Sequence, residues 1–124
     1  MTIQEQFEQL EKTVRGYNPA ADFAQIRAAF EFAERSHAGQ KRKSGEPYII
    51  HPLAVAQIVA EELKLDSESI EAALLHDVIE DTPATHEEVS RLFSPTIADL
   101  VEGVSKLTRI QYATKEDEQM ENLR

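Results

Sequence analysis

The sequence predicts an all-α domain. Apolar residues recur at helical spacing along most of the chain, and the segments between them are short and carry proline, glycine or helix-capping residues. We find no convincing strand pattern and no internal repeat. A chain of 124 residues fits one domain with a core of its own.

The first two expected helices are amphipathic. One should cover residues 3–15 and end at Gly16, followed by a turn at residues 17–19. The next should cover residues 20–38, with Gly39 as its C-cap. The stripes that define them are Ile3, Phe7, Leu10 and Val14 in the first helix and Phe23, Ile26, Phe30 and Ala33 in the second.

A polar loop and two further helices should follow. Residues 39–50 are the loop, and a third helix should cover residues 51–63, with Pro52 in its favoured first turn. Asp66 and Ser67 form the N-terminal cap of a fourth helix.

The last third of the chain should also be helical. Thr85 followed by Glu88 is a capping-box pattern that opens a helix reaching Phe93, and Ser94-Pro95 starts another. We expect that helix to cover about residues 96–106, with Ile97, Leu100, Val101 and Val104 facing inward. Residues 107–114 should be less regular. Residues 115–124 should form a polar helix that is cut in mid-helix, as in a domain truncated at its C-terminus.

Composition excludes several classes of protein. A net charge of −10 argues against a broad nucleic-acid-binding surface. The absence of cysteine excludes disulfides and thiolate metal sites, and the acidic N-terminus is unlike a signal peptide, so we expect a cytoplasmic protein. No apolar run approaches the roughly 20 residues of a membrane span, so we expect no membrane partner.

Residues 72–83 are the most informative stretch. They open as a helix that is apolar all round, which belongs inside a domain, and then present His76, Asp77, Glu80 and Asp81. Unpaired buried charge is costly, so such groups are usually paired or bound to metal. Residues four apart stack on one helix face, and a helix C-terminus favours a cation. This stretch is therefore predicted to form the floor of an active site.

Several spaced motifs resemble the hydrolase domain of the Rel/SpoT alarmone enzymes, within the HD superfamily of metal-dependent phosphohydrolases. The resemblance covers about residues 17–124 and leaves residues 1–16 as an N-terminal helix. It implies an HD-domain helical bundle. The motifs are Arg-Lys-Ser-Gly-Glu-Pro-Tyr at 42–48, His51-Pro52, Ala-Ala-Leu-Leu-His-Asp at 72–77, Glu-Asp-Thr at 80–82 and Val-Glu-Gly-Val-Ser-Lys-Leu at 101–107.

The resemblance implies hydrolysis of the 3′-pyrophosphate of ppGpp and pppGpp, giving GDP or GTP and pyrophosphate, in a protein with a downstream synthetase domain. The family's metal, usually Mn²⁺, would be held by His51, His76 and Asp77, and Glu80 and Asp81 would position or activate the attacking water. A fourth ligand of the family, an aspartate in a later Leu-Ala-Asp-Arg-Leu-His-Asn-Met-type segment, has no counterpart in this sequence.

The ligand types do not identify the metal. Two imidazoles and a carboxylate suit Mn, Fe, Co or Zn. Taken alone, His51 could be a helix-start residue satisfied by local hydrogen bonds, but its helix must pack against the buried one, which favours a ligand. Glu80 and Asp81 alone would be a solvated helix end. We interpret His37 and His86 as structural.

The basic residues stand out in an acidic chain. Lys41, Arg42 and Lys43 would by default be a solvated loop. The implied substrate carries several phosphate charges, however, and the resemblance assigns Arg42, Lys43 and Ser44 to nucleotide contact. We expect Tyr48 to be a packing residue rather than a platform for the base.

Two alternatives remain open. One is a regulatory HD domain that binds nucleotide without hydrolysing it, against which the intact His, Asp and Glu positions argue. The other is an HD phosphohydrolase acting on a different nucleotide, against which the motif at residues 42–48 argues by resemblance.

Overall fold

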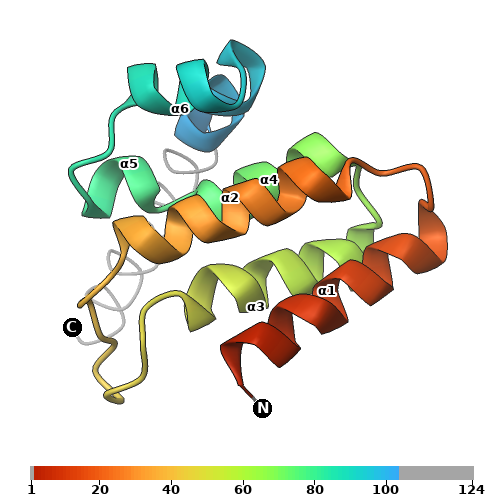
Figure 1. Cartoon of the computed structure of the whole chain (residues 1–124), viewed down its shortest axis with the longest axis horizontal. Coiled ribbons are helices and arrows are strands. Elements are labelled where there is room, and N and C mark those ends of the chain that lie inside the picture. Colours follow the sequence, from red (N-terminus) through yellow and green to blue (C-terminus); the bar gives the residue numbers. More distant parts are fainter. Residues whose placement is uncertain (1, 104–124) are drawn as a thin grey trace, which may run out of the picture.

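The computed structural model describes residues 2–103, and these are helical apart from their connections (Figure 1). The lone bridge between Lys41 and Pro47 is the extent of β pairing within residues 2–103, so the all-α prediction is confirmed. The elements are α1 (Ile3–Tyr17), α2 (Phe23–Ser36), α3 (Ile50–Ile58), the π-helix η1 (Val59–Leu63), α4 (Ser67–Leu75), α5 (Val78–Asp81), α6 (His86–Leu92) and a helical segment over 95–103.

Side-chain caps define where several helices begin. Thr2 and Glu5 form a reciprocal capping box on α1. The side chains of Asp22, Asp66 and Thr85 each accept a hydrogen bond from the backbone N–H three residues on, which satisfies a donor that the helix itself leaves unpaired. The predicted starts of α4 and α6 are therefore confirmed.

The core lies between α2 and α4 on one side and α1, α3 and η1 on the other, with α4 touching both α2 and α3 (Figure 1). The expected stripe of α1 is buried through Phe7, Leu10 and Val14. Phe7 stacks on Phe30 of α2 with ring centroids 4.4 Å apart. Residues 72–75 of α4 are also buried, as expected for the middle of a domain.

Some predicted boundaries are wrong. The first helix does not stop at Gly16, because Tyr17 adds a residue and its hydroxyl anchors the last turn on the Leu65 carbonyl at 2.6 Å. The second helix starts at Phe23 rather than residue 20, because Asp22 caps it, and it ends at Ser36. Its C-cap is therefore His37, while Gly39 turns the chain two residues later with φ of +84°.

Two other expectations need correction. The third helix continues to Leu63 as expected, but its last five residues form η1 rather than α-helix, and Lys64 follows in the left-handed conformation. Leu100 does not face the core, since it is 38% exposed, whereas Ile97 and Val101 are buried. The expectations for Val104 and for residues 104–124 lie outside the described residues. None of the described helices is long and apolar enough to cross a membrane.

Candidate active site

The predicted floor of the site is a junction between two helices. α4 ends at Leu75, His76 is its C-cap, and Asp77 is the N-cap of α5. The expectation of one continuous helix through Asp81 is therefore wrong. The chain turns tightly here, with the His76 N–H directed at the Ala73 carbonyl, and His76 remains beside the partial negative charge at the C-terminus of α4.

Three expected metal ligands converge at this junction. Asp77 Oδ2 lies 3.0 Å from His76 Nε2 and 3.5 Å from Nε2 of His51, which comes from α3. One ligand atom from each residue lies within 4.8 Å of the others. The group is screened from solvent, since the side chains of His76 and Asp77 are 5% and 13% exposed. We call these three residues the triad.

The imidazole of His76 is oriented by a second contact. Its Nδ1 lies 2.7 Å from the Ala73 carbonyl oxygen. Because a carbonyl only accepts, Nδ1 must carry a proton, which leaves Nε2 to face the triad. Metal-binding histidines typically donate their other ring N–H in this way. This donor set therefore fits a divalent cation.

Electrostatics at the triad reflect burial and close pairing. Burial opposes ionisation of Asp77, but hydrogen bonds and charges from His76, Tyr48 and His51 outweigh it and lower the Asp77 pKa. Burial alone would lower the His76 pKa, yet Asp77 and the Ala73 carbonyl raise it overall. Burial and the neighbouring His76 lower the pKa of His51. The carboxylate is thus held in its anionic form.

Tyr48 is a residue whose role the sequence analysis missed in part. Its ring packs as expected, 4.6 Å from the ring of buried His37 and 5.9 Å from that of His51. Its hydroxyl lies 2.8 Å from Asp77 Oδ2 and 3.2 Å from Asp81 Oδ2. Burial and these carboxylates raise the Tyr48 pKa, so the hydroxyl stays protonated and donates. Its place in the 42–48 motif, three residues before His51, was the available signal.

The two acidic residues expected beside the triad differ in how the structure connects them to it. Asp81 reaches the triad through the shared Tyr48 hydroxyl, and Gln40 Nε2 donates to its backbone carbonyl at 2.6 Å. Glu80 lies exposed on the same short helix, α5. The structure therefore links Asp81 to the triad through Tyr48 and places Glu80 on the adjacent surface.

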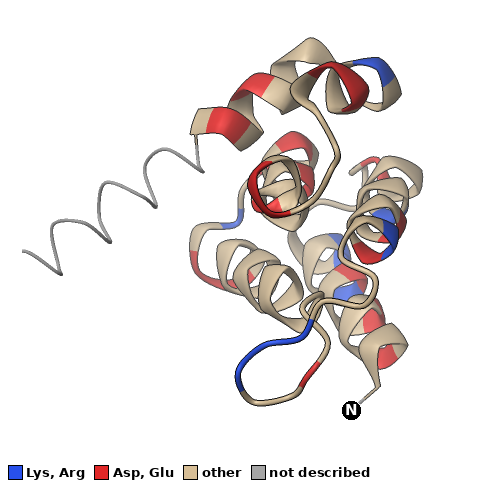
Figure 2. Cartoon of the chain, turned by 90° about the vertical axis from the view of Figure 1, so that its left-hand side faces the viewer, with Lys and Arg blue, Asp and Glu red and all other residues tan. Residues whose placement is uncertain are grey.

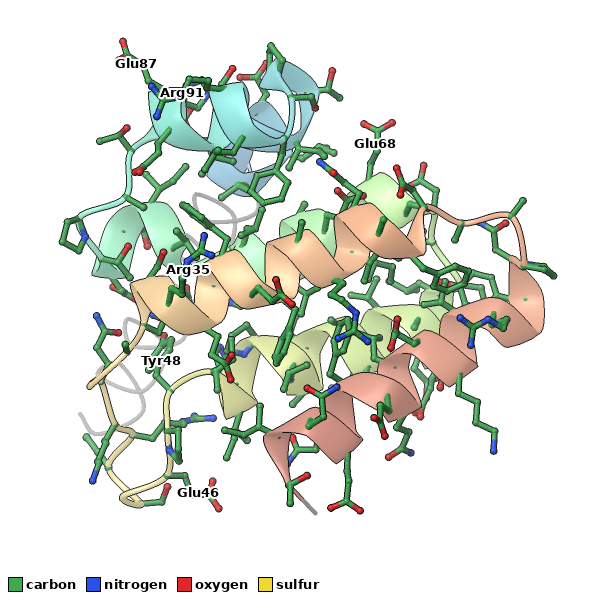
Figure 3. The ribbon with its side chains drawn as sticks, in the orientation of Figure 1. Arg35, Glu46, Tyr48, Glu68, Glu87 and Arg91 are labelled. Atoms are coloured by element: carbon green, nitrogen blue, oxygen red, sulfur yellow. The ribbon has the colours of Figure 1, made fainter. Side chains whose placement is uncertain are left out.

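The predicted basic residues lie on a loop that projects from the helices at the bottom of the view in Figure 2. We call residues 41–47 the basic loop. Its tip is a turn closed by the Gly45 N–H on the Arg42 carbonyl, and Gly45 has a φ of +90°, which favours glycine. Figure 3 shows Tyr48 at the base of the loop and Glu46 further out. A surface hollow of about 630 Å³ is lined by Lys41, Arg42, Lys43, Ser44, Glu46 and Tyr48.

Tyr48 therefore belongs to both features. It lines the hollow and bonds the triad, so the hollow opens next to the expected metal ligands. Basic side chains next to a group of potential metal ligands form an arrangement that suits phosphoryl chemistry.

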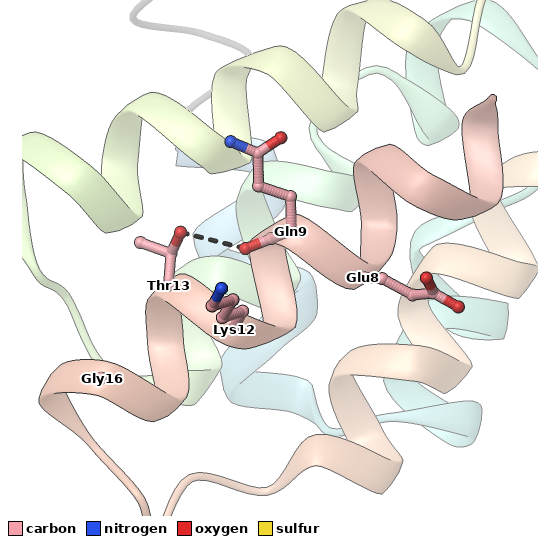
Figure 4. A pocket seen from close by; sticks show the side chains of 5 residues that line it. All are labelled: Glu8, Gln9, Lys12, Thr13 and Gly16. Carbon is pink, nitrogen blue, oxygen red and sulfur yellow. Dashed lines mark hydrogen bonds between the residues drawn. The ribbon is translucent and has the colours of Figure 1, made fainter. Parts of the chain in front are cut away.

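Two other surface features lie apart from this site. A shallow hollow of about 650 Å³ on α1 is lined by residues of that helix alone, including Glu8 and Lys12 (Figure 4). His86, interpreted as structural, pairs with Asp99 at 3.0 Å, with Glu102 close by. The Asp99 side chain is 74% exposed, so this is a surface ion pair of small energetic value.

Comparison with known proteins identifies the family to which this chain is similar. The HD domain family matches residues 29–124. The bifunctional (p)ppGpp synthase/hydrolase SpoT of Escherichia coli K12 is 51% identical over 118 residues, which cover 95% of this chain and 17% of that protein. A GTP pyrophosphokinase of Myxococcus xanthus is 49% identical over 90% of this chain and 15% of its own length. A solved structure described as a metazoan ortholog of SpoT that hydrolyses ppGpp matches with a TM-score of 0.63 and 36% identity, covering 66% of this chain and 48% of that one.

Proposed function

The chain belongs to the HD domain family, and from this premise we propose that it is the (p)ppGpp hydrolase region of a Rel/SpoT-type enzyme. The reaction is hydrolysis of the 3′-pyrophosphate, which yields GDP or GTP and pyrophosphate. The observation that carries the proposal is the contact of the triad with the basic hollow through Tyr48. Because the chain spans 17% of its curated relative from Escherichia coli, a downstream synthetase partner is part of the proposal.

The triad would hold a divalent metal, which we propose to be Mn²⁺. His51, His76 and Asp77 supply two nitrogens and one oxygen, and the anionic state of Asp77 favours a cation. Such an ion supplies Lewis acidity toward phosphoryl oxygens.

The acidic residues of α5 would handle the attacking water. Glu80, exposed next to Asp81, would accept the proton that water loses as it attacks phosphorus. Asp81, held through its side chain by Tyr48 and through its carbonyl by Gln40, would orient that water. Breaking the bond between phosphorus and the 3′-oxygen then releases pyrophosphate, and the 3′-oxygen takes up a proton to become the hydroxyl of GDP or GTP.

The basic loop would hold the nucleotide. A protein with a net charge of −10 repels a polyphosphate, so local positive charge is needed at the entrance. Arg42 and Lys43 line the hollow together with the Ser44 hydroxyl. The arginine offers paired donors that match phosphate oxygens or a guanine edge.

The test is release of pyrophosphate from ppGpp in the presence of Mn²⁺, measured on this chain and on the full natural gene product. We expect release that a chelator abolishes. Asp77→Ala should abolish it too, while Asp99→Ala, which removes an exposed aspartate of the surface ion pair, should leave it unchanged. A gene product that binds Mn²⁺ but releases no pyrophosphate would contradict the proposal.

A further inference from the structure

Tyr48 makes contacts that differ from those of an ordinary packing residue. Its hydroxyl lies 2.8 Å from Asp77 Oδ2, the same oxygen that faces His51 Nε2 and His76 Nε2. A carboxylate can rotate about its terminal bond, and a hydrogen bond to one oxygen fixes that rotation. The Tyr48 hydroxyl therefore adds a third contact that holds this Asp77 oxygen between the two imidazoles.

The Tyr48 side chain is itself held from several directions. The ring of His37, which is 3% exposed, lies against it with an interplanar angle of 32°, and the His51 ring contacts it edge-on. His37 is fixed in turn by Gln40, whose Oε1 lies 3.0 Å from His37 Nδ1. The backbone N–H of Tyr48 bonds the Gln40 carbonyl at 3.0 Å. These contacts fix the position of the hydroxyl.

The same contacts attach the basic loop to the site. Gln40 and Tyr48 flank residues 41–47, and each of them also bonds α5 through Asp81. Both ends of the loop are thus fixed to the element that carries the proposed water-orienting residue. These bonds therefore fix the position of the hollow relative to the triad.

We propose that Tyr48 is a positioning residue, which aligns Asp77 for a divalent cation and joins the basic loop to the metal centre. This inference rests on the function proposed above. In this role Tyr48 contacts Asp77, a proposed metal ligand, and not the metal itself. Hydrogen-bond partners of metal ligands typically contribute 10- to 100-fold in affinity, by order of magnitude.

The test compares Tyr48→Phe with Tyr17→Phe. Both variants keep the aromatic ring and lose one hydroxyl. Tyr17 is the last residue of α1, and its hydroxyl bonds the Leu65 carbonyl rather than a residue of the triad. Mn²⁺ alone is titrated into each protein by calorimetry, after thermal unfolding in chelator shows that both are folded. We expect the Kd of Tyr48→Phe to rise by roughly 10- to 100-fold and that of Tyr17→Phe to match the wild type.

A second measurement separates positioning from a general structural role. Turnover of ppGpp by Tyr48→Phe should fall most at limiting Mn²⁺ and recover in part when Mn²⁺ is added in excess, because the lost hydroxyl also held Asp81. An unchanged Kd, or turnover that does not respond to added Mn²⁺, would overturn the inference and leave the hydrolase proposal standing. Wild-type protein that binds Mn²⁺ without hydrolysing ppGpp would contradict the hydrolase alone, and the Kd ratio would still decide the role of Tyr48.

Discussion

Glu71 is a buried acid in the middle of α4, and replacing it tests how the core is stabilised. Its side chain is 1% exposed, and Oε1 has no hydrogen-bond partner among the described residues. Burial, with smaller effects from Asp22, Glu68 and Asp66, raises the Glu71 pKa from 4.5 to about 7. Glu71→Gln removes the ionisable group and keeps nearly the same shape.

The direction of the effect follows from the raised pKa. The folded state binds a proton that the unfolded chain releases between pH 4.5 and 7, so stability is highest below pH 4.5 and falls as the pH rises toward 7. The interval from 4.5 to about 7, at roughly 1.4 kcal/mol per pH unit, corresponds to about 3 kcal/mol lost by pH 8. Glutamine carries no such pH dependence.

The assay is urea unfolding followed by circular dichroism at pH 5 and pH 8. Relative to wild type, Glu71→Gln should gain about 2 to 3 kcal/mol in unfolding free energy between the two pH values. Glu34→Gln, which replaces an exposed glutamate on α2, serves as the control and should show no such difference. An equal effect of Glu71→Gln at both pH values would refute the reasoning, since it would mean that Glu71 is not held in its neutral form.

The remaining predictions concern the site. Asp77→Ala should abolish Mn²⁺ binding in calorimetry and leave a helical far-UV spectrum, because Asp77 contributes no apolar side chain to the core; retained binding would contradict the ligand assignment. Glu80→Gln should keep the metal and lower turnover by roughly 10²–10⁴, the range for proton-transfer groups, and normal turnover would exclude that role. Arg42→Ala should raise KM with kcat nearly unchanged, since it removes substrate binding, whereas Arg91→Ala on α6 should alter neither. A normal KM for Arg42→Ala would indicate that the basic loop is a solvated surface loop with no role in substrate binding.

Much of the fold and part of the site could be predicted because they follow local rules. Caps at Asp66 and Thr85 satisfy donors a few residues away, and the apolar stripe of α1 repeats at helical spacing. His76 and Asp77 could be singled out because ionisable groups follow a buried run. These signals lie within one or two helical turns of sequence.

The missed features depend on contacts between distant segments. Neither the burial of Glu71 nor the end of helix α4 at Leu75 is encoded in residue spacing, because each depends on how α4 packs against α2 and α3. The Tyr48 hydroxyl meets its partners only once the residue that follows the basic loop is brought next to Asp77 and Asp81. The resemblance identified the motif that contains Tyr48 but not the direction in which its side chain points.

The π-helix η1 has a consequence for how this chain tolerates change in length. The wider turn of a π-helix gives η1 room to take up one inserted residue between α3 and α4. Because the extra residue is taken up before Asp66, the cap of α4 keeps its place, and the rotational phase of that helix is preserved. Deleting one residue from η1 should convert it to α-helix. The turn at Lys64 would then adjust the short connection to α4. The same helix faces can thus stay on the core when the length of this connection changes by one residue.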